Sequence, residues 1–431
     1  MSRNTPNVWQ LAEDVLTGNW KGLHTVPAKT LYPHQWSWDA AFIAVGLAHV
    51  APQRAWQDLH SLFEAQWPDG RVPHIVFDPS VSDRDYFPGQ SFWKSPHGTS
   101  GIVQPPVHAL AALLVHRAGP APDQLRSLYE PLVAQQTYLS QRRDAGGAGL
   151  ASIVHPWESG LDNSPAWDQA LAGVDADPSL MTRIRRRDVE VSVVSHRPTD
   201  LDYARYITLA AAYRDNGYAD GGVQGPHPFF VECPAFNALT AAAELALAEI
   251  AGEIGADPRP HRDRAAAITD AILQHLYDPA TGLFHARDVR TGRLSPARCI
   301  SGLLPLMLPG LPEPVVDSLV AAATSAHFGL SDGLPLPSYD RLAADFDPLR
   351  YWRGPIWINM NWLIWRGLLQ HGRTELAAAL RRSMLDIVER SGCFEYFDPG
   401  TGEGIGTAEF SWTAALAIDL IASGDRAPVP V

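Results

Sequence analysis

The apolar positions of the chain recur every three or four residues along most of its length, often with alanine between them. This is the period of amphipathic α-helices, and strand signals are scarce, so the pattern predicts an all-α fold. We expect helices at 37–50, 52–67, 105–117, 124–143, 202–217, 236–255, 259–277, 296–308, 314–327, 356–371, 373–391 and 410–422. These twelve segments would form six helical hairpins, the number that closes into a toroid.

The expected helices alternate in character. Segments 236–255 and 356–371 are apolar on nearly every face, as inner-ring helices are. Segments 259–277 and 373–391 carry charges on one side, as outer-ring helices do. No linker divides the chain, so we expect a single domain over residues 1–431.

Two segments, 68–104 and 144–201, are too long to be simple connections between helices. Both are rich in aromatic and polar residues, and long loops inside a compact domain are usually functional. We therefore expect them to form the walls or the lid of an active site.

Composition and charge exclude several classes of protein. The chain has 431 residues, of which 46% are hydrophobic and 19% charged, as in globular enzymes and unlike disordered chains. Its 34 Lys and Arg against 47 Asp and Glu give a net charge of −13, which argues against nucleic acid or an anionic membrane surface as a partner. The single basic tract holds Arg183, Arg185, Arg186 and Arg187 and is interrupted at once by acidic residues, so we expect a solvated loop there.

The three cysteines indicate neither a disulfide framework nor a zinc site, because they are odd in number, far apart and without metal-ligand spacing. The N-terminal residues lack an apolar signal core, and no apolar stretch is long enough to span a membrane. We therefore expect a cytoplasmic protein with no metal and no cofactor. The sequence leaves a homo-oligomer open.

Tryptophan and acidic residues meet immediately ahead of an expected helix, in the motif WSWDAAF at 36–42. The faces of Trp36 and Trp38 suit the C–H face of a sugar ring, and Asp39 can accept hydrogen bonds from sugar hydroxyls. Alternatively, Ser37 or Asp39 caps the helix and the tryptophans pack in the core. The motif alone leaves both interpretations open.

The segment WESGLDNSPAWD at 157–168 holds three carboxylates, Glu158, Asp162 and Asp168, together with two tryptophans, Trp157 and Trp167. Apolar walls disfavour the charged form of a carboxyl group, so a pKa in this segment should rise toward the range of a general acid. The alternatives are a turn-forming or cation-binding cluster, or a helix N-cap at Asp162 or Asn163.

Glu409 stands in the glycine-rich stretch GEGIGTAEF at 402–410, at the first turn of an apolar helix. Amides at a helix N-terminus favour an ionised carboxylate, which is what a general base needs in order to activate water. In the alternative interpretation, Glu409 only stabilises the first turn of the helix.

Two further loop-to-helix junctions, at 95–106 and 351–362, combine amide or guanidinium groups with aromatics, and together these junctions point to a carbohydrate pocket. The chain has no dinucleotide fingerprint after a strand, no Walker loop, no HExxH motif and no GxSxG nucleophile elbow. An epimerase on a similar toroid would need histidine acid/base pairs, and a lectin-like protein would not need two carboxylates across a pocket.

The motifs WSWDAAF at 36–42, PDGRVPH at 68–74, IVQPP at 102–106, WESGLDNSP at 157–165, YWRGPIWINMNW at 351–362 and GTAEFSWTAAL at 406–416 together resemble glycoside hydrolase family 63. Their order and spacing run through nearly the whole chain. Within that family the chain looks like the compact bacterial members that hydrolyse mannosylglycerate or glucosylglycerate.

The resemblance implies an (α/α)6 barrel, with long loops as a cap over the active site, and inversion at an α-linked sugar. It implies that Asp162 of the DNSP element is the general acid and that Glu409, before the FSW element, is the general base. A basic residue should meet the carboxylate of a charged aglycone. Arg197 is our candidate, with Arg205 and Arg353 as rivals. The substrate-binding residues are expected to be Tyr32, Trp36, Trp38, Asp39, Gln104, Arg197, Tyr203, Tyr351, Trp352 and Trp357.

We therefore expect an inverting α-glycoside hydrolase that cleaves 2-O-α-glucosylglycerate, 2-O-α-mannosylglycerate or both into hexose and glycerate. An α-glucosidase or trehalase-like enzyme for neutral disaccharides is the alternative, and its aglycone site would lack an arginine. Glucose and mannose differ at one hydroxyl, so the sequence leaves the preference between them open.

Overall fold

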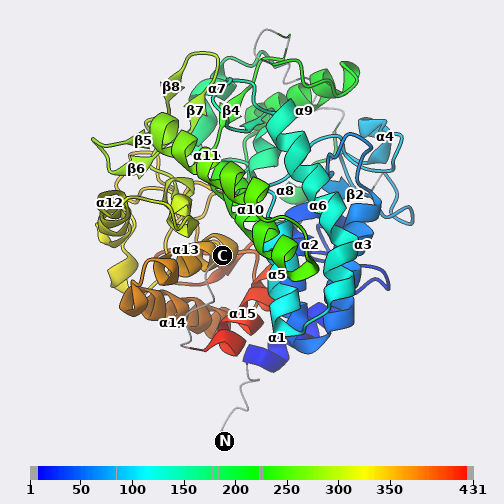
Figure 1. The fold of residues 1–431 in the computed structure, drawn as a ribbon. Helices are drawn as coiled ribbons and strands as arrows, with labels where there is room; N and C mark the ends of the chain where they lie inside the picture. Colours follow the sequence, from blue (N-terminus) through cyan, green and yellow to red (C-terminus); the bar gives the residue numbers. More distant parts are fainter. Residues whose placement is uncertain are drawn as a thin grey trace, which may run out of the picture.

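The computed structural model describes residues 8–424, except 84, 177–178, 180, 182–183, 223–224 and 226, and shows a mostly helical protein (Figure 1). Within these residues, six helices form a closed inner ring in which each contacts the next and the last returns to the first. In chain order they are α2 (Ser37–Val50), α5 (His108–Ala118), α10 (Pro234–Ile254), the 3-10 helix η5 (Ile300–Met307), α13 (Ile358–Gln370) and α15 (Ser411–Ser423).

An outer helix precedes each inner helix along the chain, which makes the fold an (α/α)6 barrel. The outer helices of the described residues are α1 (Val8–Gly18), α3 (Pro52–Glu64), α6 (Pro122–Arg142), α11 (Arg259–Leu276), α12 (Glu313–Thr324) and α14 (Thr374–Ser391). The ring closes where α1 and α15, from opposite ends of the chain, pack side by side (Figure 1). The toroid predicted from the helical period is confirmed.

The twelve ring helices are not quite the twelve that the sequence predicts. Helix α1 completes the outer ring but was not expected, whereas the expected helix at 202–217 is α9 (Asp200–Asp215), which is not one of the ring helices. The segment expected at 296–308 is the 3-10 helix η5, which contains Pro305. A proline inside a helix lacks the N–H that an α-helical hydrogen bond needs, which weighs against regular α-helix there.

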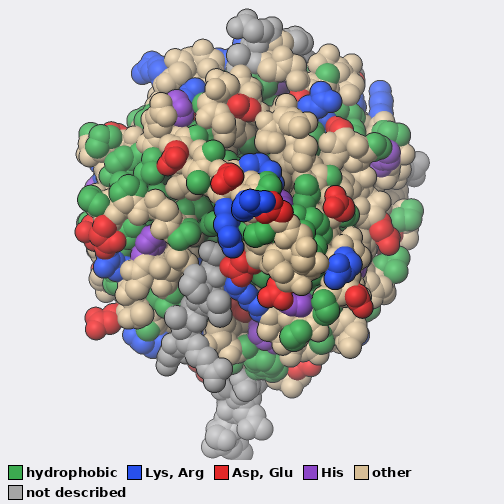
Figure 2. Space-filling model, in the orientation of Figure 1, with side chains coloured by type: hydrophobic (Ala, Val, Ile, Leu, Met, Phe, Trp, Pro, Cys, Tyr) green, Lys and Arg blue, Asp and Glu red, His purple; other side chains and the backbone are tan. Residues whose placement is uncertain are grey.

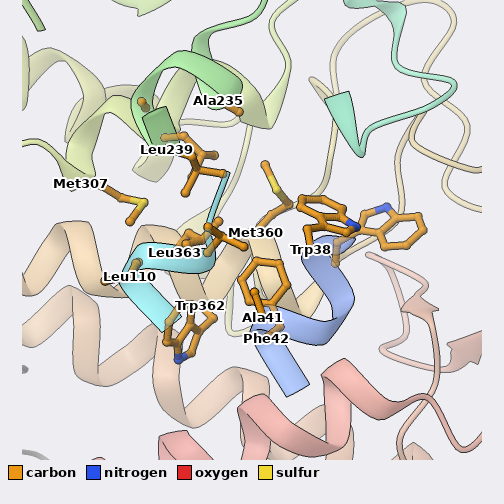
Figure 3. Close-up of a cluster of buried hydrophobic side chains, with 14 of the residues drawn as sticks. Trp38, Ala41, Phe42, Leu110, Ala235, Leu239, Met307, Met360, Trp362 and Leu363 are labelled. Carbon is orange, nitrogen blue, oxygen red and sulfur yellow. The ribbon is translucent and has the colours of Figure 1, made fainter. Parts of the chain in front are cut away.

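The inner helices are buried because their sequences are apolar all round, as predicted for 236–255 and 356–371. Small residues let them approach closely: a Cβ added to Gly46 of α2 would lie only 2.3 Å from the Cα of Ala415 in α15. Figure 3 shows side chains from several inner elements meeting in one core, labelled among them Trp38, Phe42, Leu110, Leu239, Met307, Met360 and Trp362.

Short strands tie the loops at the ends of the barrel. β1 (Gln35–Trp36) pairs with β2 (Ile75–Val76), β5 (Tyr277–Asp278) with β6 (Leu283–Phe284), and β9 (Tyr396–Phe397) with β10 (Gly404–Ile405), all antiparallel. A four-stranded antiparallel sheet has the order β3 (Ser152–Ile153), β4 (Val231–Glu232), β7 (Arg287–Asp288) and β8 (Arg293–Leu294).

Most of the remaining short helices lie in the two long loop segments. They are α4 (Gln90–Trp93), η1 (Pro156–Ser159), η2 (Pro165–Trp167), α7 (Asp168–Ala172), α8 (Arg187–Val191) and η4 (Val194–His196), while η6 (Leu330–Asp332) lies after α12. Of the helices in the described residues, none has the length and apolarity to cross a membrane. Acidic, basic and apolar side chains are interspersed over the face shown in Figure 2.

Candidate active site

A cavity of about 930 Å³, counted with its open mouth, is bounded by loops that lead into the inner helices. Both long segments, 68–104 and 144–201, contribute residues to its wall, as expected of them. The lining residues are Leu31, Tyr32, Trp36, Trp38, Asp39, His74, Ile75, Tyr86, Phe87, Pro88, Gln104, Trp157, Gly160, Asp162, Arg187, Asp188, Arg197, Pro198, Tyr203, Tyr206, Tyr351, Glu395, Phe410 and Trp412.

The motif at 36–42 delivers both tryptophans and its acidic residue to the cavity. Trp36 ends strand β1, and Trp38 and Asp39 lie in the first turn of α2, where the amide of Trp38 donates to Oε1 of Gln104 at 3.2 Å. The ring of Trp38 packs so closely on Gly160 that a Cβ there would lie 2.5 Å from the ring. Gly160 also has φ +69°, so glycine suits this position on both grounds. The wall thus combines aromatic faces with hydrogen-bonding groups.

Asp162 lies in the turn between η1 and η2 and faces the cavity. Its backbone carbonyl accepts hydrogen bonds from Nε1 of Trp167 at 3.0 Å and from the hydroxyl of Tyr206 at 3.1 Å, which fix the turn. Burial raises the pKa of the Asp162 carboxyl to about 7, opposed by Arg197 and reinforced slightly by the charge of Glu395. A carboxyl group with this pKa is about half protonated at pH 7 and can donate a proton.

The other two carboxylates of the segment 157–168 have different surroundings. Glu158 is fully buried and binds Arg143 through two hydrogen bonds of 2.7 Å, so it belongs to an internal ion pair. Asp168 forms an ion pair with Arg353 at 2.5 Å. Of the three, only Asp162 lines the cavity.

Glu395 is a second carboxylate on the cavity wall and is not among the site residues expected from the sequence. It is 1% exposed and directly precedes β9. The hydroxyl of Tyr32 donates to its Oε1 at 2.7 Å, the amide of Thr407 donates to its Oε2 at 3.2 Å, and Nη1 of Arg197 lies 3.9 Å from Oε1. One signal was available in the sequence, since a lone glutamate interrupts the apolar run CFEYF at 393–397.

Glu409, the residue expected as general base, is exposed and does not line the cavity. Its backbone has φ +53°, in the left-handed region, and α15 starts only two residues later, at Ser411. At this turn Phe410 is buried in the cavity wall while Glu409 stays at the surface. Glu409 also lies outside the first turn of α15, which does not support the alternative of a first-turn stabiliser.

Trp352 and Trp357, two of the expected substrate-binding residues, likewise do not line the cavity. Their rings stack on each other at 3.8 Å and are almost fully buried. Tyr351 does line the cavity, and its ring contacts that of Trp357 at 5.0 Å. The two tryptophans therefore belong to the core that supports Tyr351. The other expected substrate-binding residues all line the cavity: Tyr32, Trp36, Trp38, Asp39, Gln104, Arg197 and Tyr203.

Of the three arginines considered for a substrate carboxylate, Arg197 lines the cavity and the rivals do not. The guanidinium of Arg197 lies over the ring of Tyr351 at 4.0 Å. Its Nη1 atom is buried without a hydrogen-bond partner among the described residues. Arg353 forms an ion pair with Asp168, and Arg205 is half-buried and is not one of the lining residues.

The expectation of a solvated basic loop is wrong for part of its tract. Arg185 is exposed, but Arg186 is buried and Arg187 lines the cavity. Arg183 lies outside the described residues. The acidic residues that interrupt the tract explain the difference, because Asp188 pairs with Arg186 at 2.7 Å and so allows the arginine to be buried. Among the described residues, no group of three or more His, Cys, Asp or Glu side chains is arranged to hold a metal ion.

Comparison with known proteins identifies the family of the chain. The family model described as the mannosylglycerate hydrolase MGH1-like glycoside hydrolase domain matches residues 32–413. A mannosylglycerate hydrolase of Rubrobacter radiotolerans is 40% identical over 96% of both chains, and a glucosylglycerate hydrolase of Mycolicibacterium hassiacum is 35% identical over 94% of this chain and 95% of its own.

Solved structures give the same result. The GH63 mannosylglycerate hydrolase of Thermus thermophilus in complex with Tris and D-glycerate is 39% identical, with a TM-score of 0.90 over 96% of this chain and 100% of the other. The neutral trehalase Nth1 of Saccharomyces cerevisiae, at 15% identity and a TM-score of 0.61, shares the fold. The chain therefore belongs to the MGH1-like family of GH63 glycoside hydrolases, as its motifs suggested.

Proposed function

We propose that this glycoside hydrolase cleaves 2-O-α-mannosylglycerate, 2-O-α-glucosylglycerate or both into hexose and glycerate, with inversion at the sugar. The observation that carries the proposal is a single cavity that holds a protonatable carboxyl, Asp162, a second carboxylate, Glu395, and the guanidinium of Arg197. The relatives named for these two substrates, aligned over nearly their whole length, support it.

In the proposed reaction, protonated Asp162 donates its proton to the glycosidic oxygen as the bond between that oxygen and C1 breaks. A water molecule attacks C1 from the opposite face, and a carboxylate removes a proton from it. The glycerate hydroxyl leaves neutral, and the hexose is released with inverted configuration. Inverting enzymes of this kind keep their two carboxyls roughly 6.5–9.5 Å apart so that the water fits between them.

We assign the base role to Glu395 instead of Glu409. A base must reach the attacking water inside the cavity, which Glu395 borders and Glu409 does not. Glu395 is also held by Tyr32 and by the amide of Thr407, so its carboxylate has a fixed orientation. Positioning of this kind lowers the entropic cost of bringing water and C1 together.

The aglycone would place its carboxylate near Arg197. The buried Nη1 atom of Arg197 has no hydrogen-bond partner among the described residues, and a buried donor without such a partner is costly. A substrate carboxylate would satisfy it, with Tyr203 and Tyr86 beside it on the wall. In a neutral disaccharide the corresponding group would be a hydroxyl. A hydroxyl forms a weaker hydrogen bond with the guanidinium than a carboxylate does, so it offsets less of the cost of burying this donor.

A proton-NMR time course of the purified protein with mannosylglycerate and glucosylglycerate side by side tests the proposal. Early appearance of the β-anomer of one hexose would establish hydrolysis, inversion and sugar preference together. No turnover of either glycoside, with cleavage of trehalose or kojibiose instead, would contradict it and favour the neutral-disaccharide alternative.

Three expectations from the sequence remain predictions: a single domain over residues 1–431, a cytoplasmic location and a homo-oligomer. The continuous helical ring is consistent with the single domain. Cell fractionation would test the location, and sedimentation would test the oligomeric state. The proposed substrate is a small molecule with a charged aglycone. The proposed hydrolysis requires no cofactor.

A further inference from the structure

Three consecutive charged residues, Arg186, Arg187 and Asp188, lie beside the cavity and have different partners. Arg186 is 8% exposed and acts as an anchor: it donates to Asp188 at 2.7 Å, to Asp200 at 2.9 Å and to the carbonyl of Pro198 at 2.9 Å. Its guanidinium also lies over the ring of Tyr203 at 4.5 Å. These contacts tie the start of α8 to the start of α9.

Asp188 connects this anchor to the cavity. Its Oδ2 atom accepts from Arg186 and also lies 3.4 Å from Nε of Arg197. These arginines hold the pKa of the Asp188 carboxyl below its usual range, against the effect of its burial. Arg197 thus has one carboxylate at 3.4 Å, from Asp188, and another at 3.9 Å, from Glu395. Its positive charge is already balanced by the protein.

Arg187 differs from both of its arginine neighbours. It lines the cavity, yet it forms no ion pair with any carboxylate of the described residues. Its hydrogen bond to the carbonyl of Thr30, at 3.4 Å, uses one Nη2 donor and leaves the charge uncompensated. The exposed carboxylate of Glu190 acts on it only at longer range.

We propose that Arg187 is a specificity-determining residue that supplies the uncompensated positive charge for the carboxylate of the aglycone. This inference rests on the proposed function, and it adds a second cation to Arg197. Without Arg187, an entering carboxylate would meet Arg197 together with the negative charges of Asp188 and Glu395. With Arg187 on the same wall, the substrate anion completes the charge balance, which a neutral aglycone cannot do.

The test compares two substrates that differ only in this charge, 2-O-α-glucosylglycerate and 2-O-α-glucosylglycerol, and the same pair with mannose. We expect Arg187→Gln to lower kcat/KM for the anionic glycoside about 10- to 100-fold, the usual range for losing a hydrogen bond to a charged group. For the neutral glycoside kcat/KM should change less than twofold. The inhibition constant of free D-glycerate should rise in parallel, which gives a readout independent of turnover.

Salt and a conservative variant sharpen the test. The value of kcat/KM for the anionic substrate should fall between 20 and 300 mM NaCl in the wild type and fall less in Arg187→Gln, because salt screens a partly exposed charge. Arg187→Lys should restore part of the selectivity. Arg185→Gln is the matched control: it removes the same charge two residues away, from an exposed side chain that pairs with Glu190 and does not line the cavity.

The outcomes separate the two proposals. Suppose that the wild type hydrolyses an anionic glycoside. If Arg187→Gln then leaves the selectivity and the inhibition by D-glycerate unchanged, or lowers kcat/KM equally for the anionic and the neutral glycoside, the role of Arg187 is overturned while the proposed function stands. If the wild type hydrolyses no anionic glycoside, the proposed function fails and this inference fails with it.

Discussion

The hydroxyl of Tyr32 donates a 2.7 Å hydrogen bond to Oε1 of Glu395, across 363 positions of the sequence. Tyr32 precedes β1 in the first loop of the barrel, and Glu395 precedes β9 in one of the last. Nη2 of Arg197 lies 3.5 Å from the same hydroxyl. Three loops that are distant in sequence therefore meet at one carboxylate, which is the arrangement expected of a catalytic group whose orientation matters.

Removing this hydrogen bond should slow the reaction. Tyr32→Phe keeps the ring, which packs edge-on against Trp36 and Phe410, and deletes only the donor. We expect kcat to fall roughly tenfold, as for the loss of one hydrogen bond to a charged group, with a smaller change in KM. Steady-state kinetics checks this. Tyr129→Phe is the control, since its hydroxyl bonds His261 on the outer helices; an equal loss in both variants would contradict the prediction.

The choice between the two glutamates can be decided by one pair of variants. Glu395→Gln should lower kcat by about 10²–10⁴-fold, the range for removing a general base. Glu409→Gln should retain activity within about twofold, because its exposed side chain does not reach the cavity. Initial rates under substrate saturation measure both. The reverse ranking would restore Glu409 as the base.

Asp162 should set the alkaline limit of the activity. The proton it donates has a pKa raised by burial to about 7, so kcat/KM should fall about tenfold for each pH unit above that value. Asp162→Asn should lower kcat by about 10²–10⁴-fold while the dissociation constant of substrate, measured by calorimetry, changes little. A variant that keeps its turnover but no longer binds substrate would make Asp162 a recognition residue.

The same carboxyl should lower stability at alkaline pH. Its pKa is near its ordinary value of 3.8 in the unfolded chain and about 7 in the folded protein, so the folded state holds the proton more tightly. Folding stability is then lost as the pH rises from about 4 to 7, by up to about 4 kcal/mol. Asp162→Asn lacks this loss, so its thermal midpoint should exceed that of the wild type at pH 8 and approach it at pH 4. Melting curves across this range decide the matter; a difference that does not vary with pH would refute it.

The two stacked tryptophans, Trp352 and Trp357, should contribute to folding stability and not directly to substrate binding. Trp357→Ala removes a fully buried ring and should cost about 3–5 kcal/mol of unfolding free energy. Trp36→Ala, on the half-buried cavity wall, should chiefly raise KM. Denaturant titration and kinetics of both variants separate the two effects. Similar stability losses with similar KM changes would show that the distinction does not hold.

The barrel and several residues of the cavity wall could be predicted from local patterns in the sequence. Helical period and all-round apolarity are local properties, so they identify the inner helices and, with the long loops between them, the end of the barrel where a cavity forms. Trp36, Trp38, Asp39 and Asp162 lie within short motifs whose composition suits a sugar site, although the motif at 36–42 also allows packing in the core. The helix at 8–18 is not among the helices expected from the sequence. The 3-10 helix η5 lies where an α-helix is expected, because the spacing of its apolar residues does not distinguish the two kinds of helix.

Which side chains share the cavity depends on how the barrel folds. Glu395 and Glu409 look alike in sequence, both beside aromatic residues near the start of the last helix. They separate because Glu395 directly precedes strand β9 and accepts a hydrogen bond from Tyr32, whereas Glu409 lies at a left-handed turn that leaves it exposed. The same holds for Arg186 and Arg187, adjacent in the chain but one paired and one facing the cavity. The direction of a side chain at a turn depends on backbone conformation and on partners hundreds of residues away, and neither is a local property of the sequence.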